Sequence, residues 1–223
     1  DLIVEVPMQQ ADGKWVLDLD LFFSKVTDKT RALMIVSPNN PTGWVMPAAD
    51  IKAVLDFARA RGIWIVADEV YGRTMHEALV APSFLNYAAN DDRLYVINSF
   101  SKTWAMTGWR LGWLIGPSDS EDKIRDVILY ETMGCPSFSQ YGAITALRHG
   151  EDFLLMQKKL WKANQDLVVE QVAQIPRVSM VKSPAAFYAF LRIEGETDSF
   201  ALARRLIDEA GVSLAPGGAF GHG

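Results

Sequence analysis

The most informative stretch of this 223-residue chain lies at residues 98–112 and reads NSFSKTWAMTGWRLG. Its first residue ends the mainly apolar run at residues 94–98, which is typical of a buried strand. Ligands of open α/β sheets bind beyond the carboxyl ends of the strands, so we expect this stretch to lie at a binding edge. Its polar members include the hydroxyl groups of two serines, one amine and one guanidinium, set among apolar residues.

Lys102 and Arg110 are the residues of this stretch best suited to chemistry. An amine near apolar groups and a second cation gives up its proton more readily and can then attack a carbonyl. The planar guanidinium of Arg110, together with the hydroxyl of Ser99, suits a phosphate dianion. Taken alone, however, the stretch fits a lysine in a polar surface loop better than it fits a site.

Two further polar segments follow other strands of the same predicted sheet. The run SPNNPTG at residues 37–43 comes after a strand at 32–36, and DEVY at residues 68–71 comes after a strand at 64–67. Separately, the first is a turn sequence, and the second fits a helix cap with a packed aromatic ring. Together, the three clusters follow three strands of one sheet, which favours a shared binding edge over coincidence.

The alternation of short apolar runs with amphipathic stretches indicates an α/β fold with a mostly parallel sheet. A helix at residues 48–61 is expected, since Pro47 favours a helix start and Gly62 a stop. The expected strands of the sheet lie at residues 2–6, 32–36, 64–67, 94–98 and 111–115.

Beyond residue 117 the pattern becomes mainly helical. Helices are expected at residues 119–130, 139–148, 151–174 and 199–210, and strands at 178–181 and 187–191. We therefore divide the chain into a large α/β domain at 1–150, a connecting helix at 151–174 and part of a smaller α+β domain at 175–223.

Composition excludes several classes of protein. A formal net charge of −5 without a basic block disfavours nucleic-acid binding. No apolar run reaches the length of about 18 residues that a membrane span needs. The single cysteine, Cys135, fits a reducing cytoplasm and a packed thiol. His76, His149 and His222 show no metal-ligand spacing, so no metal site is expected.

The three clusters, in this order and spacing, resemble the class I/II aminotransferases, the aspartate-aminotransferase-like group of fold-type I enzymes that use pyridoxal 5′-phosphate (PLP). The resemblance rests on NPTG at residues 40–43, Asp-x-x-Tyr at 68–71, and Ser-x-Ser-Lys at 99–102 with an arginine eight residues on. It covers most of the chain, up to the loop GGAF at 217–220. It implies a PLP-binding large domain and amino-group transfer between an α-amino acid and a 2-oxo acid.

The resemblance also assigns roles residue by residue. Lys102 is the expected Schiff-base lysine, which also moves the proton at the substrate Cα. Asp68 is expected to pair with the pyridinium nitrogen, and Tyr71 and Asn40 to hydrogen-bond the phenolic oxygen of the ring. The phosphate is expected to be held by Ser99, Ser101 and Arg110. In the family the bond between Asn40 and Pro41 tends to be cis.

Parts of the family pattern are not found in this sequence, whose two ends both look cut. The family's small-residue loop for the phosphate, its ring-stacking aromatic and the arginine that binds the substrate carboxylate are among them. A homodimer is expected from the resemblance alone. Two alternatives stay open: a PLP-dependent lyase or decarboxylase of the same fold, and an aminotransferase-like ligand-sensing domain of a transcriptional regulator.

Overall fold

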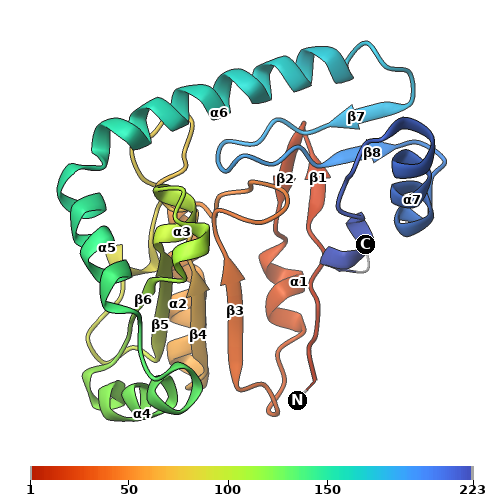
Figure 1. Cartoon of the computed structure of the whole chain (residues 1–223). Helices are drawn as coiled ribbons and strands as arrows, with labels where there is room; N and C mark the ends of the chain where they lie inside the picture. Colours follow the sequence, from red (N-terminus) through yellow and green to blue (C-terminus); the bar gives the residue numbers. More distant parts are fainter. Residues whose placement is uncertain (1, 222–223) are drawn as a thin grey trace.

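A four-stranded sheet forms the centre of the computed structural model, which describes residues 2–221 (Figure 1). Its strand order is β3-β4-β5-β6. Parallel pairs join β3 (Ala32–Val36), β4 (Trp64–Asp68) and β5 (Leu94–Ser99), whereas β6 (Gly112–Ile115) runs antiparallel to β5. The expected α/β fold with a mostly parallel sheet is therefore confirmed, with strand ends shifted by one residue at β4, β5 and β6.

The core lies between this sheet and α2 (Ala48–Arg61), at the bounds expected from the sequence. Pro47 precedes the helix, and Gly62 ends it in the left-handed conformation with φ 63°. Alternate strand residues point toward α2 and are buried, as period-two geometry requires. The shared core side chains include Ile35, Ile51, Val54, Leu55, Ile65, Ala67 and Val96. Each large one contributes about 1.5–3 kcal/mol by its burial.

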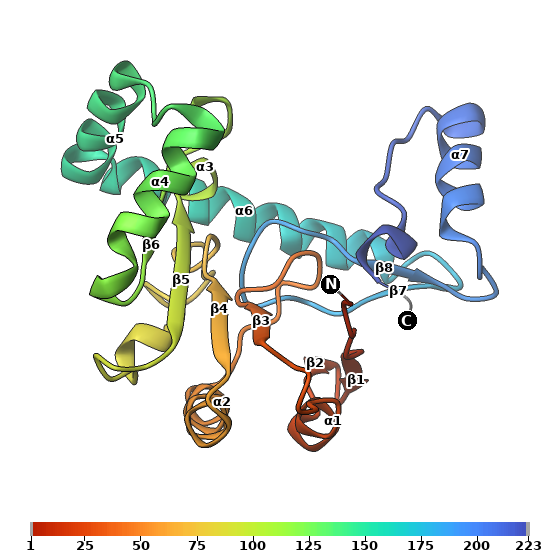
Figure 2. The same ribbon diagram turned by 90° about the horizontal axis from the view of Figure 1, so that it is seen from below.

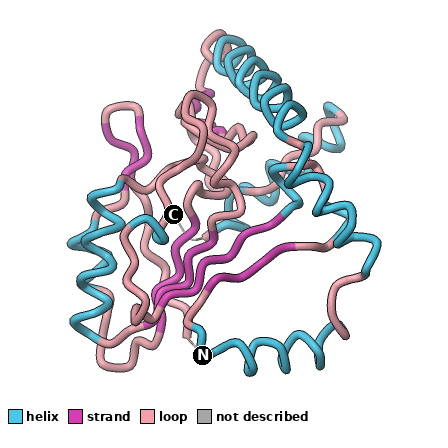
Figure 3. The backbone as a smooth tube through the Cα atoms, turned by 90° about the vertical axis from the view of Figure 1, so that its left-hand side faces the viewer, coloured by secondary structure: helices cyan, strands magenta, loops and turns pink. Residues whose placement is uncertain are grey.

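The other sheet face is less covered and bears the strand-end groups of interest. Figure 2 places α1 (Leu19–Ser24) and α2 on one side of the sheet and α6 on the opposite side. The tube in Figure 3 shows the twist of the central strands. Asp68 and Ser99 stand at the carboxyl ends of β4 and β5 and are half-buried.

The expected strand at residues 2–6 is wrong. Leu2 and Ile3 are 90% and 86% exposed, because no neighbouring strand within the described chain pairs with this apolar run. The first two strands of the chain are instead β1 (Gln9–Ala11) and β2 (Lys14–Val16), which form a separate two-stranded hairpin. Its two-residue loop is Asp12-Gly13, both with positive φ (50° and 70°), which is the turn that an Asp-Gly pair favours in hairpins.

The helices after the sheet follow the expected order. They are α4 (Glu121–Thr132), α5 (Ser137–His149) and α6 (Glu151–Val172), and α6 crosses above the carboxyl ends of the strands (Figure 1). None of the helices within residues 2–221 has both the length and the apolar composition of a membrane span.

The described C-terminal part contains a two-stranded antiparallel sheet, one α-helix and a short 3₁₀ helix at Gly217–Phe220. The sheet pairs β7 (Val178–Met180) with β8 (Leu191–Ile193), and α7 covers Ser199–Ala210. The expected strand at 187–191 is wrong except for its last residue, because the preceding residues contact the segment after β4 instead of pairing with β7. His222 lies outside the described residues.

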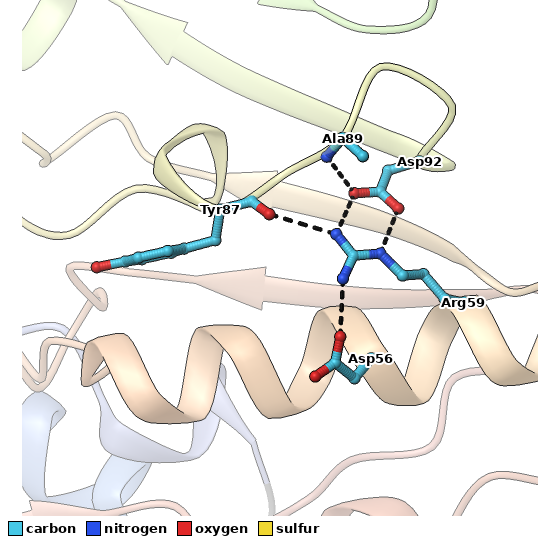
Figure 4. A network of polar contacts seen from close by, with 5 residues as sticks. All are labelled: Asp56, Arg59, Tyr87, Ala89 and Asp92. Atoms are coloured by element: carbon cyan, nitrogen blue, oxygen red, sulfur yellow. Dashed lines mark hydrogen bonds and ion pairs between the residues drawn. The ribbon is translucent and has the colours of Figure 1, made fainter.

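The opposite end of the sheet, where β4 and β5 begin, is closed by a network of polar contacts around Arg59 and Asp92 (Figure 4). A cavity of about 360 Å³ opens beside it and is lined in part by Gly62, Ile63 and Arg93. These residues precede the strands, so the cavity is separate from the predicted binding edge.

Candidate active site

Asp68 is the last residue of β4 and is fixed in register with both neighbouring strands. It lies opposite Val36 of β3 and Ile97 of β5. Its backbone carbonyl accepts from the Ser37 N–H at 3.0 Å, which joins the SPNNPTG loop to this strand end. Its side-chain Oδ1 accepts from the Val70 N–H at 3.1 Å. Within residues 2–221 this is the one hydrogen bond of the carboxylate, so Oδ2 is available to a ligand.

Glu69, next to Asp68, is committed to the fold. It is 7% exposed, and its Oε1 accepts from the backbone N–H of Phe84 at 2.8 Å. Burial raises the pKa of its carboxyl. Glu69 therefore has a structural role, and Asp68 is the acid of this pair that keeps an oxygen without a partner in residues 2–221.

Tyr71 is buried, with 3% of its surface exposed, in the turn after β4. The amine of Lys102 lies 5.9 Å from the centroid of its ring. The Tyr71 hydroxyl is hydrogen-bonded to the hydroxyl of Tyr188. Burial raises the pKa of Tyr71, so its hydroxyl keeps its proton at neutral pH. Two of the predicted site residues, from separate segments, are thus brought together.

Lys102 lies on α3 (Phe100–Thr103), a single turn that follows β5 directly. Ser99 caps this turn, since its Oγ accepts from the Ser101 N–H at 3.1 Å and donates to the Leu111 carbonyl at 3.3 Å. Phe100, Ser101 and Thr103 of this turn are buried, while Lys102 is half-buried. No hydrogen bond or ion pair involves the Lys102 amine within the described part of the chain.

Arg110 lies at the other end of the same loop, in the left-handed conformation with φ 52°. One of its five N–H donors, on Nη1, donates to the Thr107 carbonyl at 2.9 Å. The side chain is exposed, and its remaining donors have no partner among residues 2–221. Arg110 is therefore not bonded to Ser99 or Lys102, although a free guanidinium fork is what an incoming phosphate would need.

Asn40 lies in the loop after β3, where the peptide bonds between Ser37 and Pro38 and between Asn40 and Pro41 are both cis. The family's cis bond at Asn40 is thus present. The neighbouring Asn39 holds the loop through its Oδ1, which accepts from the Thr42 hydroxyl at 2.8 Å. Asn40 itself is exposed and has no hydrogen bond to the other predicted site residues in the described chain.

The donor set at this edge fits PLP in chemical type. Asp68, Lys102 and Arg110 are three charged groups without a counter-ion in residues 2–221, and they come from the segments that follow two neighbouring strands, β4 and β5. A proton-bearing ring nitrogen, an aldehyde and a phosphate are the complementary groups of the cofactor.

Sequence reasoning missed Tyr188, which contacts Tyr71 across 117 residues of the chain. Residues 187–191 read as a strand because their aromatic and apolar residues have high strand propensity. No local signal marks a contact of this sequence separation.

The sequence matches the family described as aminotransferase class I and II over residues 2–222. It is 34% identical over 227 residues to a probable aspartate/prephenate aminotransferase of Aquifex aeolicus, covering 98% of this chain and 57% of that protein. It is 35% identical over 223 residues to aromatic-amino-acid aminotransferase 2 of Thermococcus litoralis, with coverage of 98% and 57%.

The solved structures that resemble this chain are also aminotransferases. The aromatic aminotransferase from Pyrococcus horikoshii OT3 matches with a TM-score of 0.90 at 34% identity, over 98% of this chain and 59% of that one. A double mutant of the Thermus thermophilus aspartate aminotransferase matches with a TM-score of 0.90 at 29% identity, over 98% and 57%. The chain thus spans less than two thirds of the length of these relatives.

Proposed function

The chain belongs to the aminotransferase class I and II family, which is PLP-dependent, and from this premise we propose that it is the central part of an aminotransferase. The proposed reaction moves an amino group between an α-amino acid and a 2-oxo acid. The observation that supports it most directly is the approach of the Lys102 amine to the buried Tyr71 ring, beside the strand end that bears Asp68.

When bound, PLP supplies an electron sink for the negative charge left at the substrate Cα. In the proposal, the Lys102 amine would hold the cofactor at its aldehyde carbon, with water as the leaving group, and would carry the proton to and from the substrate Cα. Because Lys102 has no ion pair in residues 2–221, its amine is free for both tasks.

The other residues of the edge orient the cofactor and set its charge. The Asp68 carboxylate favours the protonated form of the ring nitrogen, since the two charges attract each other. Tyr71 and Asn40 donate hydrogen bonds to the phenolic oxygen. Ser99, Ser101 and Arg110 hold the phosphate in the proposal, with Ser99 turning its hydroxyl proton from the Leu111 carbonyl to the phosphate and Arg110 supplying its unused N–H donors.

We extend the proposal to organisation and location. The division into residues 1–150, the connecting helix 151–174 and residues 175–223 agrees with the long α6 helix between two separate sheets. A homodimer follows the usual arrangement of the family. A cytoplasmic location is supported by the absence of any second cysteine beside Cys135 in the sequence.

The test uses purified full-length protein mixed with PLP and then with single amino acids. We expect a visible absorbance band from the attached cofactor, loss of that band with the preferred amino acid, and its return on addition of a 2-oxo acid. Lys102→Ala is expected to lack the band, whereas the exposed Lys159→Ala on α6 should keep it. If the protein binds PLP but none of the amino acids tested removes the band, the result would contradict amino-group transfer.

A further inference from the structure

Tyr188 is the nearest polar neighbour of Tyr71 that no motif identifies. The two hydroxyls are hydrogen-bonded, and the rings meet edge to face, with centroids 5.6 Å apart and an interplanar angle of 68°. Phe187 contacts the Tyr71 ring in a similar way at 5.8 Å, and Trp161 of α6 packs against Phe187 at 5.2 Å. The Tyr71 ring is therefore enclosed by aromatic rings, with one polar contact at its hydroxyl.

The segment that carries Tyr188 is fixed to the segment that carries Tyr71. The Ala186 N–H donates to the Thr74 carbonyl at 3.2 Å, and the His76 N–H donates to the Pro184 carbonyl at 3.0 Å. The His76 ring, through Nε2, also contacts the Ala186 carbonyl at 2.7 Å. Thr74 and Ala186 are fully buried. These contacts place the Tyr188 hydroxyl at a defined position.

A second set of contacts anchors the start of the same segment. The Ser183 hydroxyl donates to the Ala185 carbonyl at 2.9 Å and accepts from Gln165 Nε2 of α6 at 2.6 Å. Both Ser183 and Gln165 are buried. The segment is therefore held by α6 as well as by the turn after β4, so its contact with Tyr71 is not a chance approach of a loose loop.

The direction of the bond between the two phenols decides what Tyr71 can do. Each phenol has one proton and can also accept. If Tyr188 donates to the Tyr71 oxygen, the Tyr71 proton is left for another acceptor and, through cooperativity, becomes a stronger donor. If Tyr71 donates to Tyr188, its proton is used within the protein.

We propose that Tyr188 is a positioning residue, whose hydroxyl donates to Tyr71 and leaves the Tyr71 proton for the phenolic oxygen of PLP. The inference rests on the proposed function, since it requires PLP at this edge. Tyr188 acts through Tyr71 and not on the cofactor itself. A role in ring packing alone would not depend on the Tyr188 hydroxyl.

The test is a pH titration of the visible absorbance of full-length protein reconstituted with PLP. A donor to the phenolic oxygen stabilises its anion and lowers the pH midpoint of the spectral transition. Tyr188→Phe is therefore expected to raise the midpoint by about 0.5–1 pH unit, which is roughly a three- to tenfold change in proton affinity. Tyr95→Phe is the control, because Tyr95 stacks on Trp64 and its hydroxyl has no partner in the described residues.

A double variant separates positioning from packing. In a Tyr71→Phe background, Tyr188→Phe is expected to cause no further shift, because its effect passes through Tyr71. Phenylalanine keeps the ring contacts of residue 188, so the melting temperature serves as the check that the fold is intact.

Three results would overturn the inference. The first is an unchanged pH midpoint in Tyr188→Phe. The second is a lowered midpoint in that variant, which would show that Tyr188 accepts the Tyr71 proton. The third is a shift of full size when Tyr188→Phe is added to the Tyr71→Phe background. In each case the proposed function is still supported if the wild-type protein shows the visible absorbance band and Lys102→Ala lacks it. A wild-type protein without such a band overturns both.

Discussion

The carboxylate of Asp92 accepts two hydrogen bonds from the guanidinium of Arg59, from Nε to Oδ1 and from Nη2 to Oδ2, each 2.7 Å long (Figure 4). This pair joins α2 to the loop that enters β5. The Asp92 side chain is 6% exposed, whereas Arg59 is 39% exposed. Arg59 holds the pKa of the Asp92 carboxyl below its usual range, and the Ala89 N–H adds to this effect.

Asp92→Asn is expected to lower the free energy of unfolding at pH 7 by about 1–2 kcal/mol, a value reduced for the exposure of Arg59. Because the pKa of Asp92 is lower in the folded state, its stabilisation is present above its unfolded pKa of about 3.9 and is lost as the pH falls through the folded value. Urea denaturation between pH 7 and pH 3 measures the difference between wild type and variant.

The exposed neighbour Asp91→Asn is the matched control and should stay within about 0.5 kcal/mol of wild type. The gap between Asp92→Asn and wild type should narrow below about pH 4. A gap of constant size down to pH 3 would mean that the ion pair is not its source.

Gly43 supports the contact between the loop after β3 and residues 183–185. Its φ is +67°, and an added Cβ would lie 2.4 Å from the Ser183 Cβ and 2.5 Å from the Ala185 carbonyl oxygen. Gly43→Ala is therefore expected to lower the free energy of unfolding by about 2–4 kcal/mol, from backbone strain and overpacking together.

Gly13→Ala separates these two causes. Gly13 has a similar φ of +70°, but an added Cβ there meets nothing within 4 Å. It should show the backbone effect alone, about 1–2 kcal/mol. Equal losses in the two variants, measured by urea denaturation, would show that the steric contact with residues 183–185 contributes nothing.

The central sheet and its binding edge could be predicted because their signals are local. Residues 32–36 form a short apolar run and residues 48–61 have helical periodicity, each bounded by turn or cap residues, and both elements have the expected bounds. Asp68 and Ser99 directly follow apolar runs, which places them at strand ends without any knowledge of tertiary contacts. The family resemblance rested on these same strand-end residues.

Elements whose conformation depends on distant partners could not be predicted in this way. Residues 2–6 have strand composition but lack a neighbouring strand within the described chain, and strand propensity is expressed only within a sheet. Tyr188 lies in a segment whose conformation is set by bonds to Thr74 and His76, more than a hundred residues earlier. Periodicity carries no information on such contacts.

The Asp68 carboxylate has one oxygen without a partner in residues 2–221. An asparagine side chain at this position would keep an Oδ1 to accept from the Val70 N–H, so Asp68→Asn is expected to fold normally while losing the negative charge. Without that charge the ring nitrogen of PLP loses its protonated form at neutral pH. We expect turnover of the full-length protein to fall by about 100-fold or more, and the affinity for PLP to fall with it.

Steady-state kinetics at saturating PLP and a fluorescence titration with PLP measure the two effects. Asp126→Asn, at an exposed position on α4, is the matched control and should leave both unchanged. Because the variant differs from wild type by one charge and keeps the hydrogen bond to Val70, a loss of turnover with an unchanged melting temperature would assign the effect to that charge. If Asp68→Asn keeps wild-type turnover, the PLP ring nitrogen does not depend on the Asp68 carboxylate. A group other than Asp68 would then have to keep the ring nitrogen protonated.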